Sequence, residues 1–256
     1  MTTEATRRRT RHEPALWRVP TGLVLLSLIP ILGGAVRLTE LAGGAEVTPQ
    51  NERFFDSPLP LSFHILSVTV YSLLGAFQFV PSLRGRGWHR VAGRVLVPAG
   101  LVAALSGLWM AVLYNHPAHS GVIMLVPRLI IGSSMVLSIA LGVFYVVRRR
   151  DLVRHSAWMT RAYAIGAAAG TEALIIIGPE ILARPPNTTF QAAITVAAWI
   201  INVAVAEHVI HRRGHVRSRS GPEQPATCSV ESSTASFEPN DNDVKGARAV
   251  DPLDAL

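Results

Sequence analysis

The residues of this chain best suited to chemistry are histidines that lie near the ends of long apolar segments. His64 falls early in one segment, and His89 and His155 come just before two others. His116 and His119 occupy a short connection. A neutral imidazole nitrogen binds iron well, and axial ligands tune the potential of a haem. If the segments pack side by side, the spacing predicts two bis-histidine sites, one near each end of a helical bundle.

A second set of polar residues falls inside the apolar segments. Glu172 lies eleven residues after Arg161, which is about 16 Å along a helix and therefore near mid-bilayer. Such a residue is costly and is a functional candidate by default. Arg128 follows Pro127, so it lies either inside a helix or at the outer start of one. With Gln78, these residues form an alternative ligand or proton site, in which Glu172 is either paired with Arg128 or protonated.

Six apolar stretches are long enough to carry these residues across a membrane. A crossing helix needs about 20 mostly apolar residues. The stretches fall at residues 19–36, 61–83, 95–115, 121–147, 162–183 and 190–210. The sequence therefore predicts an all-α fold, a bundle of six transmembrane helices, whose core is made by helices 2–5 over residues 61–183.

Arginine clusters alternate with these stretches and set an orientation. Four flanking segments are rich in arginine: Arg7, Arg8, Arg9, Arg11 and Arg18; Arg84, Arg86, Arg90 and Arg94; Arg148, Arg149, Arg150, Arg154 and Arg161; Arg212, Arg213, Arg217 and Arg219. The other three connections hold only Arg37, Arg53 and Arg184. Because basic residues stay on the cytoplasmic side, we expect both termini in the cytoplasm. The membrane is expected to be the cytoplasmic (inner) membrane of a bacterium.

The composition supports a membrane protein. Hydrophobic residues make up 49% and charged residues 16% of the 256 residues, whereas soluble domains carry about 25% charged residues. The formal charge of +7 suits a nucleic-acid-binding protein, but the arginines flank apolar segments and so set orientation instead. We therefore expect the lipid bilayer as a partner and no nucleic acid.

The two ends of the chain differ from its middle. Residues 1–18 are expected to form a disordered basic arm and residues 213–256 a disordered polar tail. Between them, residues 19–212 form the six-helix membrane domain. The only cysteine, Cys228, lies in the tail, which excludes disulfides within the chain, iron–sulfur clusters and thiolate metal sites.

Three short motifs together resemble a known family. They are Gly75-Ala76-Phe77-Gln78, then Trp88-His89-Arg90-Val91-Ala92-Gly93-Arg94, and then His155-Ser156-Ala157-Trp158-Met159-Thr160-Arg161. Over about residues 60–210 the chain resembles the DUF2306 family of bacterial membrane proteins, whose upstream helix-2 histidine is matched by His64. Ser156 stands where many relatives carry a basic residue. The resemblance implies a multi-pass membrane protein of unestablished biochemistry.

The histidine pattern is also similar to that of cytochrome b561-type bundles, where helix 2 pairs with helix 4 and helix 3 with helix 5. On this hypothesis His64 and His119 hold an outer haem b, and His89 and His155 hold an inner one. The outer partner is either His116 or His119. Arg90 and Arg161 would neutralise the haem propionates, and electrons would cross the membrane to or from a quinone or another small molecule.

Two other function classes stay open. The first is a small-molecule binding or transport protein that uses Glu172, Arg128 and Gln78, with interfacial histidines. The second is a structural or accessory membrane protein. No nucleotide-binding motif, metalloprotease helix or serine nucleophile elbow is present, which disfavours a hydrolase.

Overall fold

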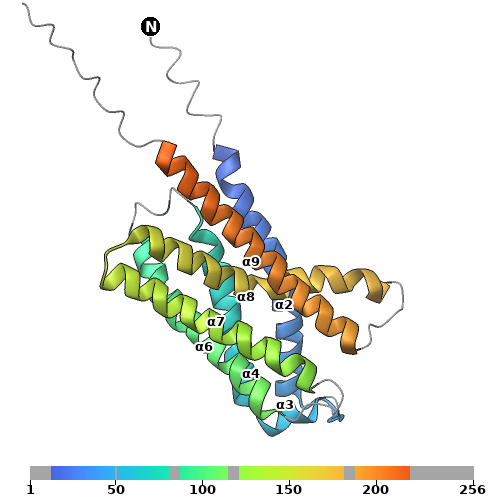
Figure 1. The fold of residues 1–256 in the computed structure, drawn as a ribbon. Helices are drawn as coiled ribbons and strands as arrows, with labels where there is room; N and C mark the ends of the chain where they lie inside the picture. Colours follow the sequence, from blue (N-terminus) through green and yellow to red (C-terminus); the bar gives the residue numbers. More distant parts are fainter. Residues whose placement is uncertain are drawn as a thin grey trace, which may run out of the picture.

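The computed structural model describes residues 13–49, 51–80, 83, 87–114, 121–181 and 188–219. Helices make up the secondary structure of these residues, which confirms the all-α prediction (Figure 1). The helices are α2 (Glu13–Gly43), α3 (Glu52–Asp56), α4 (Pro58–Phe77), α6 (Trp88–Leu113), α7 (Gly121–Val147), α8 (Leu152–Ile181) and α9 (Thr188–Arg219). The expected arm and tail lie mostly outside the described residues.

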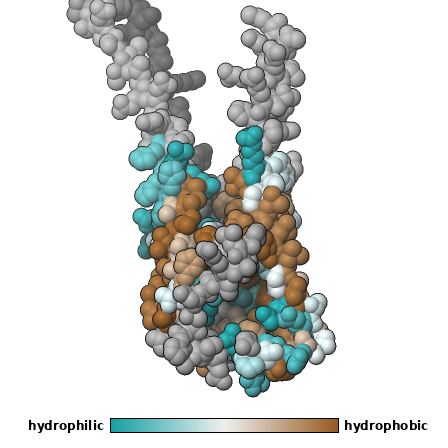
Figure 2. Space-filling model, turned by 90° about the vertical axis from the view of Figure 1, so that its right-hand side faces the viewer, coloured by the Kyte–Doolittle hydropathy of each residue, from teal (hydrophilic) through white to brown (hydrophobic). Residues whose placement is uncertain are grey.

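Five of these helices are long and apolar enough to cross a membrane. The candidate spans are Trp17–Gly43, Pro58–Phe77, Trp88–Leu113, Ile123–Val147 and Thr189–His215, in α2, α4, α6, α7 and α9. Figure 2 shows apolar residues along the flanks of the molecule, between hydrophilic residues near its upper and lower ends. A multi-pass helical membrane protein is therefore confirmed. Helix α8 is not among the five, because small and polar residues interrupt its apolar run.

Several helices begin or end at other residues than the apolar stretches predicted. Helix α2 continues to Gly43, because the chain first meets a left-handed residue at Gly44 (φ +65°). The outer connection, predicted over residues 38–60, also contains the short helix α3. Helix α9 runs on to Arg219, beyond the predicted domain end at residue 212.

The turn from α7 to α8 is tight and well defined. Arg150 has φ 52°, a left-handed conformation that normally selects glycine after a helix. The Asp151 N–H bonds the Tyr145 carbonyl at 3.0 Å, which closes the end of α7. The Asp151 Oδ1 then accepts the N–H groups of Val153 (3.0 Å) and Arg154 (2.9 Å), so this carboxylate caps the start of α8.

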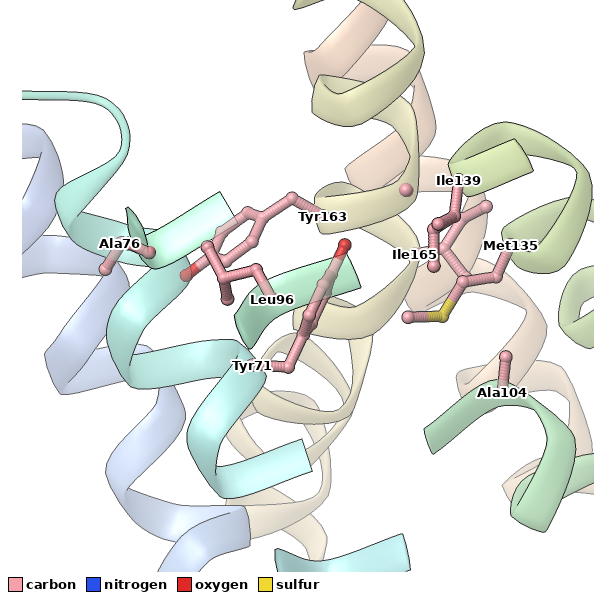
Figure 3. Packing of buried hydrophobic residues seen from close by; sticks show 10 residues of the cluster. Tyr71, Ala76, Leu96, Ala104, Met135, Ile139, Tyr163 and Ile165 are labelled. Carbon is pink, nitrogen blue, oxygen red and sulfur yellow. The ribbon is translucent and has the colours of Figure 1, made fainter. Parts of the chain in front are cut away.

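A buried cluster joins α4, α6, α7 and α8 (Figure 3). Its largest members are the rings of Tyr71 and Tyr163, whose centroids lie 5.9 Å apart. The Tyr163 hydroxyl donates to the Ser72 carbonyl at 2.9 Å, which satisfies it in the interior. Around these rings the cluster contains Ala76, Ala92, Leu96, Ala104, Met135, Ile139, Ala162 and Ile165. This packing fills the middle of the bundle and leaves its two ends to position the histidines.

Candidate functional site

The structure brings together the predicted inner histidine pair. His89 lies in the first turn of α6 and His155 in the first turn of α8. The centroids of the two imidazole rings are 6.5 Å apart, and the ring planes are perpendicular, at 90°. These two residues are 66 positions apart in the sequence, so the bundle, and not local spacing, creates the pair.

The backbone of α7 fixes the His155 ring. Its Nδ1 lies 2.8 Å from the Gly142 carbonyl oxygen. Because a carbonyl oxygen can only accept, this contact places a proton on Nδ1, so Nε2 is the nitrogen that carries the lone pair whenever the ring is neutral. Histidines that bind metals usually have their other ring nitrogen held in this way.

The ring geometry of this pair fits a single metal ion between two imidazoles. A metal on the line between the two rings, bound to one nitrogen of each at about 2.0–2.1 Å, would hold those nitrogens about 4 Å apart and the ring centres about 6.3 Å apart. The observed 6.5 Å agrees with that separation. One turn after His89, a Cβ built on Gly93 would meet no atom within 4 Å. The ring separation therefore agrees with two imidazoles on opposite sides of one metal ion.

The outer histidine of α4 is fixed in the same manner. His64 Nδ1 lies 2.9 Å from the Ala103 carbonyl oxygen and 3.2 Å from the Ser106 hydroxyl, both on α6. Its ring covers Gly107, where an added Cβ would stand 3.3 Å from the imidazole. The predicted partners, His116 and His119, lie outside the described residues. Since α6 rises about 1.5 Å per residue, His64 contacts it about 21 Å from His89.

The two arginines assigned to propionates occupy different surroundings. Arg90 is exposed at the start of α6. Arg161 instead makes a bidentate ion pair with Glu207 of α9, with Nε–Oε1 and Nη2–Oε2 distances of 2.5 and 2.9 Å. Its guanidinium also lies 4.6 Å from the Trp158 ring centroid. Glu207 was not predicted as a site residue from the sequence. Its place near the end of the last apolar stretch, among few other acids, could have indicated that it pairs with an arginine.

Glu172 lies between α9 and α2. Its Oε1 accepts a hydrogen bond from the Thr195 hydroxyl at 2.5 Å. The side chain also lines a hollow of about 270 Å³, whose other walls are Ile29, Ala169, Ala173, Ile176 and Ile177. Thr195 is a further residue that sequence reasoning missed, since a lone threonine in an apolar helix has no distinctive pattern.

The other members of the predicted polar site do not join Glu172 in this hollow. Arg128 is an exposed residue of α7 that interacts electrostatically with Glu172. The ion pairs within 4.0 Å among the described residues include Arg37–Glu40, Arg154–Asp151 and Arg161–Glu207, and Arg128 belongs to none of these three. Gln78 caps the end of α4, towards the start of α6. Glu172 lies twenty residues beyond the start of α8, so Gln78 and Glu172 are far apart in depth.

Comparison with known proteins identifies the family. A family model described as "Predicted membrane protein (DUF2306)" matches residues 61–210, which run from α4 into α9 and include the inner histidine pair, Arg161 and Glu172. No curated protein and no solved structure gives a significant match. The match covers more than half of the chain. The protein therefore belongs to the DUF2306 family of predicted membrane proteins.

Proposed function

We propose that α8 is a sixth membrane-spanning helix and that both termini are cytoplasmic, in the inner membrane of a bacterium. The start of α2 and the end of α9 lie at the same end of the bundle (Figure 1). A chain that starts and ends on the same side of a membrane must cross it an even number of times. Five candidate spans are present, so α8 would supply the sixth crossing. The arginine clusters favour the cytoplasm for that side.

The native Cys228 offers a direct test of this topology, because it is the only cysteine of the chain. A membrane-impermeant maleimide should label Cys228 in inverted vesicles but not in intact spheroplasts. Val47→Cys in a Cys228→Ser background should give the opposite result, since Val47 lies in the outer connection. Labelling of both positions from the same side would refute the proposal.

We further propose that the protein binds b-type haem through His89 and His155 and carries electrons within the membrane. The observation that carries this proposal is the perpendicular ring pair at 6.5 Å. Haem supplies one-electron chemistry, and the protein contributes the axial ligands and their orientation. The Gly142 carbonyl holds the His155 ring through Nδ1, so Nε2 would be the atom that binds the iron. A second haem would use His64 with His119 or His116.

The arginines would have separate roles at the inner site. Glu207 pairs with Arg161 and not with Arg90, and Arg90 directly follows His89. Arg90 is therefore the residue that we propose to bind a haem propionate. The Arg161–Glu207 pair instead fastens α8 to α9 and so holds the helix that carries His155. On this proposal each haem would lie towards an end of the bundle, because the buried cluster around Tyr71 and Tyr163 fills the space between.

Absorption spectra of the detergent-purified protein from haem-replete cells test this function. We expect a Soret band and, after dithionite reduction, sharp α and β bands that are diminished in His89→Ala and His155→Ala. His208→Ala is the matched control, because His208 is an exposed histidine of α9. A spectrum without haem bands in the folded wild-type protein would refute haem binding.

A further inference from the structure

Glu172 is an acidic residue in a mostly apolar part of α8, and the haem proposal gives it no role. A carboxyl group at this depth is costly and tends to be retained for function. Thr195, which is 5% exposed, donates to Oε1. Its hydroxyl also lies 3.0 Å from the Gln191 carbonyl, but the contact with Glu172 is the shorter one. Among the described residues, no hydrogen bond to the second carboxyl oxygen, Oε2, is present.

The hollow beside Glu172 opens towards lipid. Its walls come from α2 and α8, and all except Glu172 are apolar. Exposed apolar side chains surround it on the same two helices, namely Leu28, Ile29 and Leu32 of α2 and Leu174 of α8. A ligand would therefore arrive from within the bilayer.

The size of the hollow limits what it can hold. Pockets for whole drug-sized ligands measure about 300–1,000 Å³ and enclose most of the ligand. At about 270 Å³, this hollow has room for a head group of one ring or a short polar end. The rest of the molecule would remain in the lipid, so the ligand needs an apolar tail.

The charges near the hollow favour a neutral head group. Arg128 interacts electrostatically with Glu172, so positive charge is already supplied to the carboxylate from α7. An anionic head group would be repelled by Glu172, and a cationic one would have to share the carboxylate with Arg128. A neutral hydroxyl avoids both costs and can donate to the carboxylate, and hydrogen bonds to ionised acceptors are the stronger ones.

We propose that the hollow between α2 and α8 binds the neutral, hydroxyl-bearing head group of a lipid-soluble molecule, such as a quinol or a long-chain alcohol, through Glu172. The hydroxyl donates to the carboxylate, and the apolar walls hold the adjoining ring or chain. This site is independent of the inner histidine pair, which lies towards the other end of α8.

Isothermal titration calorimetry of the full-length protein in detergent tests the proposal with three probes. Decyl-benzoquinol, its oxidised quinone and decanol have comparable tails, but the quinone has no hydroxyl to donate. We expect the quinol or decanol to bind and the quinone to bind at least tenfold more weakly. Binding of the quinol alone identifies a phenolic head group, and binding of decanol alone identifies an alcohol.

Variants separate this site from a general affinity for lipids. Glu172→Gln should weaken binding about tenfold or more, because it replaces a charged acceptor by a neutral one. Ala173→Phe should block the hollow without changing the carboxylate, whereas Leu174→Phe, on the lipid-facing side of the next residue, should bind as the wild type does. Equal binding of quinol and quinone, or unchanged binding in both site variants, would overturn the proposal. The haem spectrum should not change in any of these variants, so a failure here is distinct from a failure of haem binding.

Discussion

Removing either charge of the Arg161–Glu207 pair should destabilise the protein, and the effects of the two substitutions should be strongly coupled to each other. The pair is bidentate, with distances of 2.5 and 2.9 Å, and its side chains are 27% and 33% exposed. Surface pairs contribute about 0–1 kcal/mol, and breaking a fully buried pair costs about 3–5 kcal/mol. Because one third or less of each side chain is exposed, we expect a coupling free energy of about 1–3 kcal/mol.

A double-mutant cycle measures this coupling. The variants are Arg161→Gln, Glu207→Gln and both together, and the free energy of unfolding is measured in mixed detergent micelles. Each single variant leaves one charge without its partner, so the double variant should be more stable than the sum of the single effects predicts. Loss of the contact between Arg161 and Trp158 costs about 0.5–1 kcal/mol more, but it occurs in both variants that lack Arg161 and cancels from the coupling.

The Arg154–Asp151 pair provides a matched control on the same helix. Its atoms are 3.5 Å apart and its arginine side chain is 65% exposed. The same cycle there should give about 0–1 kcal/mol. A coupling for Arg161–Glu207 no larger than that of this control would refute the reasoning from geometry and burial.

Three further predictions follow from the described structure. If the inner histidines hold a ferric haem, its electron paramagnetic resonance spectrum should show the large-gmax low-spin signal of perpendicular axial imidazoles, and a signal typical of parallel rings would contradict the 90° geometry. Arg150→Gly should raise the free energy of unfolding by about 0.5–1 kcal/mol, because φ 52° is unfavourable for residues with a side chain, and a decrease would contradict this. Gly170→Ala should lower the free energy of unfolding by about 1–3 kcal/mol, because the added methyl group would overlap the Leu26 carbonyl oxygen. Its control is Gly33→Ala, where nothing lies within 4 Å and no loss of stability is expected.

The helical class and the inner histidine pair could be predicted because their signals lie in the sequence itself. Apolar runs of sufficient length predict helices in a membrane. His89 and His155 each begin a helix on the arginine-rich side, so an antiparallel arrangement of the intervening helix brings both to the same end.

The partners of the half-buried charges could not be predicted in this way. Glu172 is hydrogen-bonded to Thr195, 23 residues away in the sequence, and Arg161 is paired with Glu207, 46 residues away. Which faces of α8 and α9 meet depends on how both helices rotate in the bundle, and neither helix alone carries that information. The sequence predicted Arg128 and Gln78 as partners of Glu172, because all three fall inside apolar segments. In the structure, neither Arg128 nor Gln78 lines the hollow beside Glu172.

The polar contacts between α8 and α9 bear on how the chain enters the membrane. Arg161 and Glu172 make α8 a poor substrate for insertion by hydrophobicity alone, and it is the one long helix outside the five apolar spans. Its partners Glu207 and Thr195, and the Thr171–Asn202 contact at 2.9 Å, all depend on α9, which follows after a short connection. If α8 is the sixth crossing that we propose, we therefore expect it to be held in the bilayer only after the ribosome has released α9, so that the two helices insert as one hairpin.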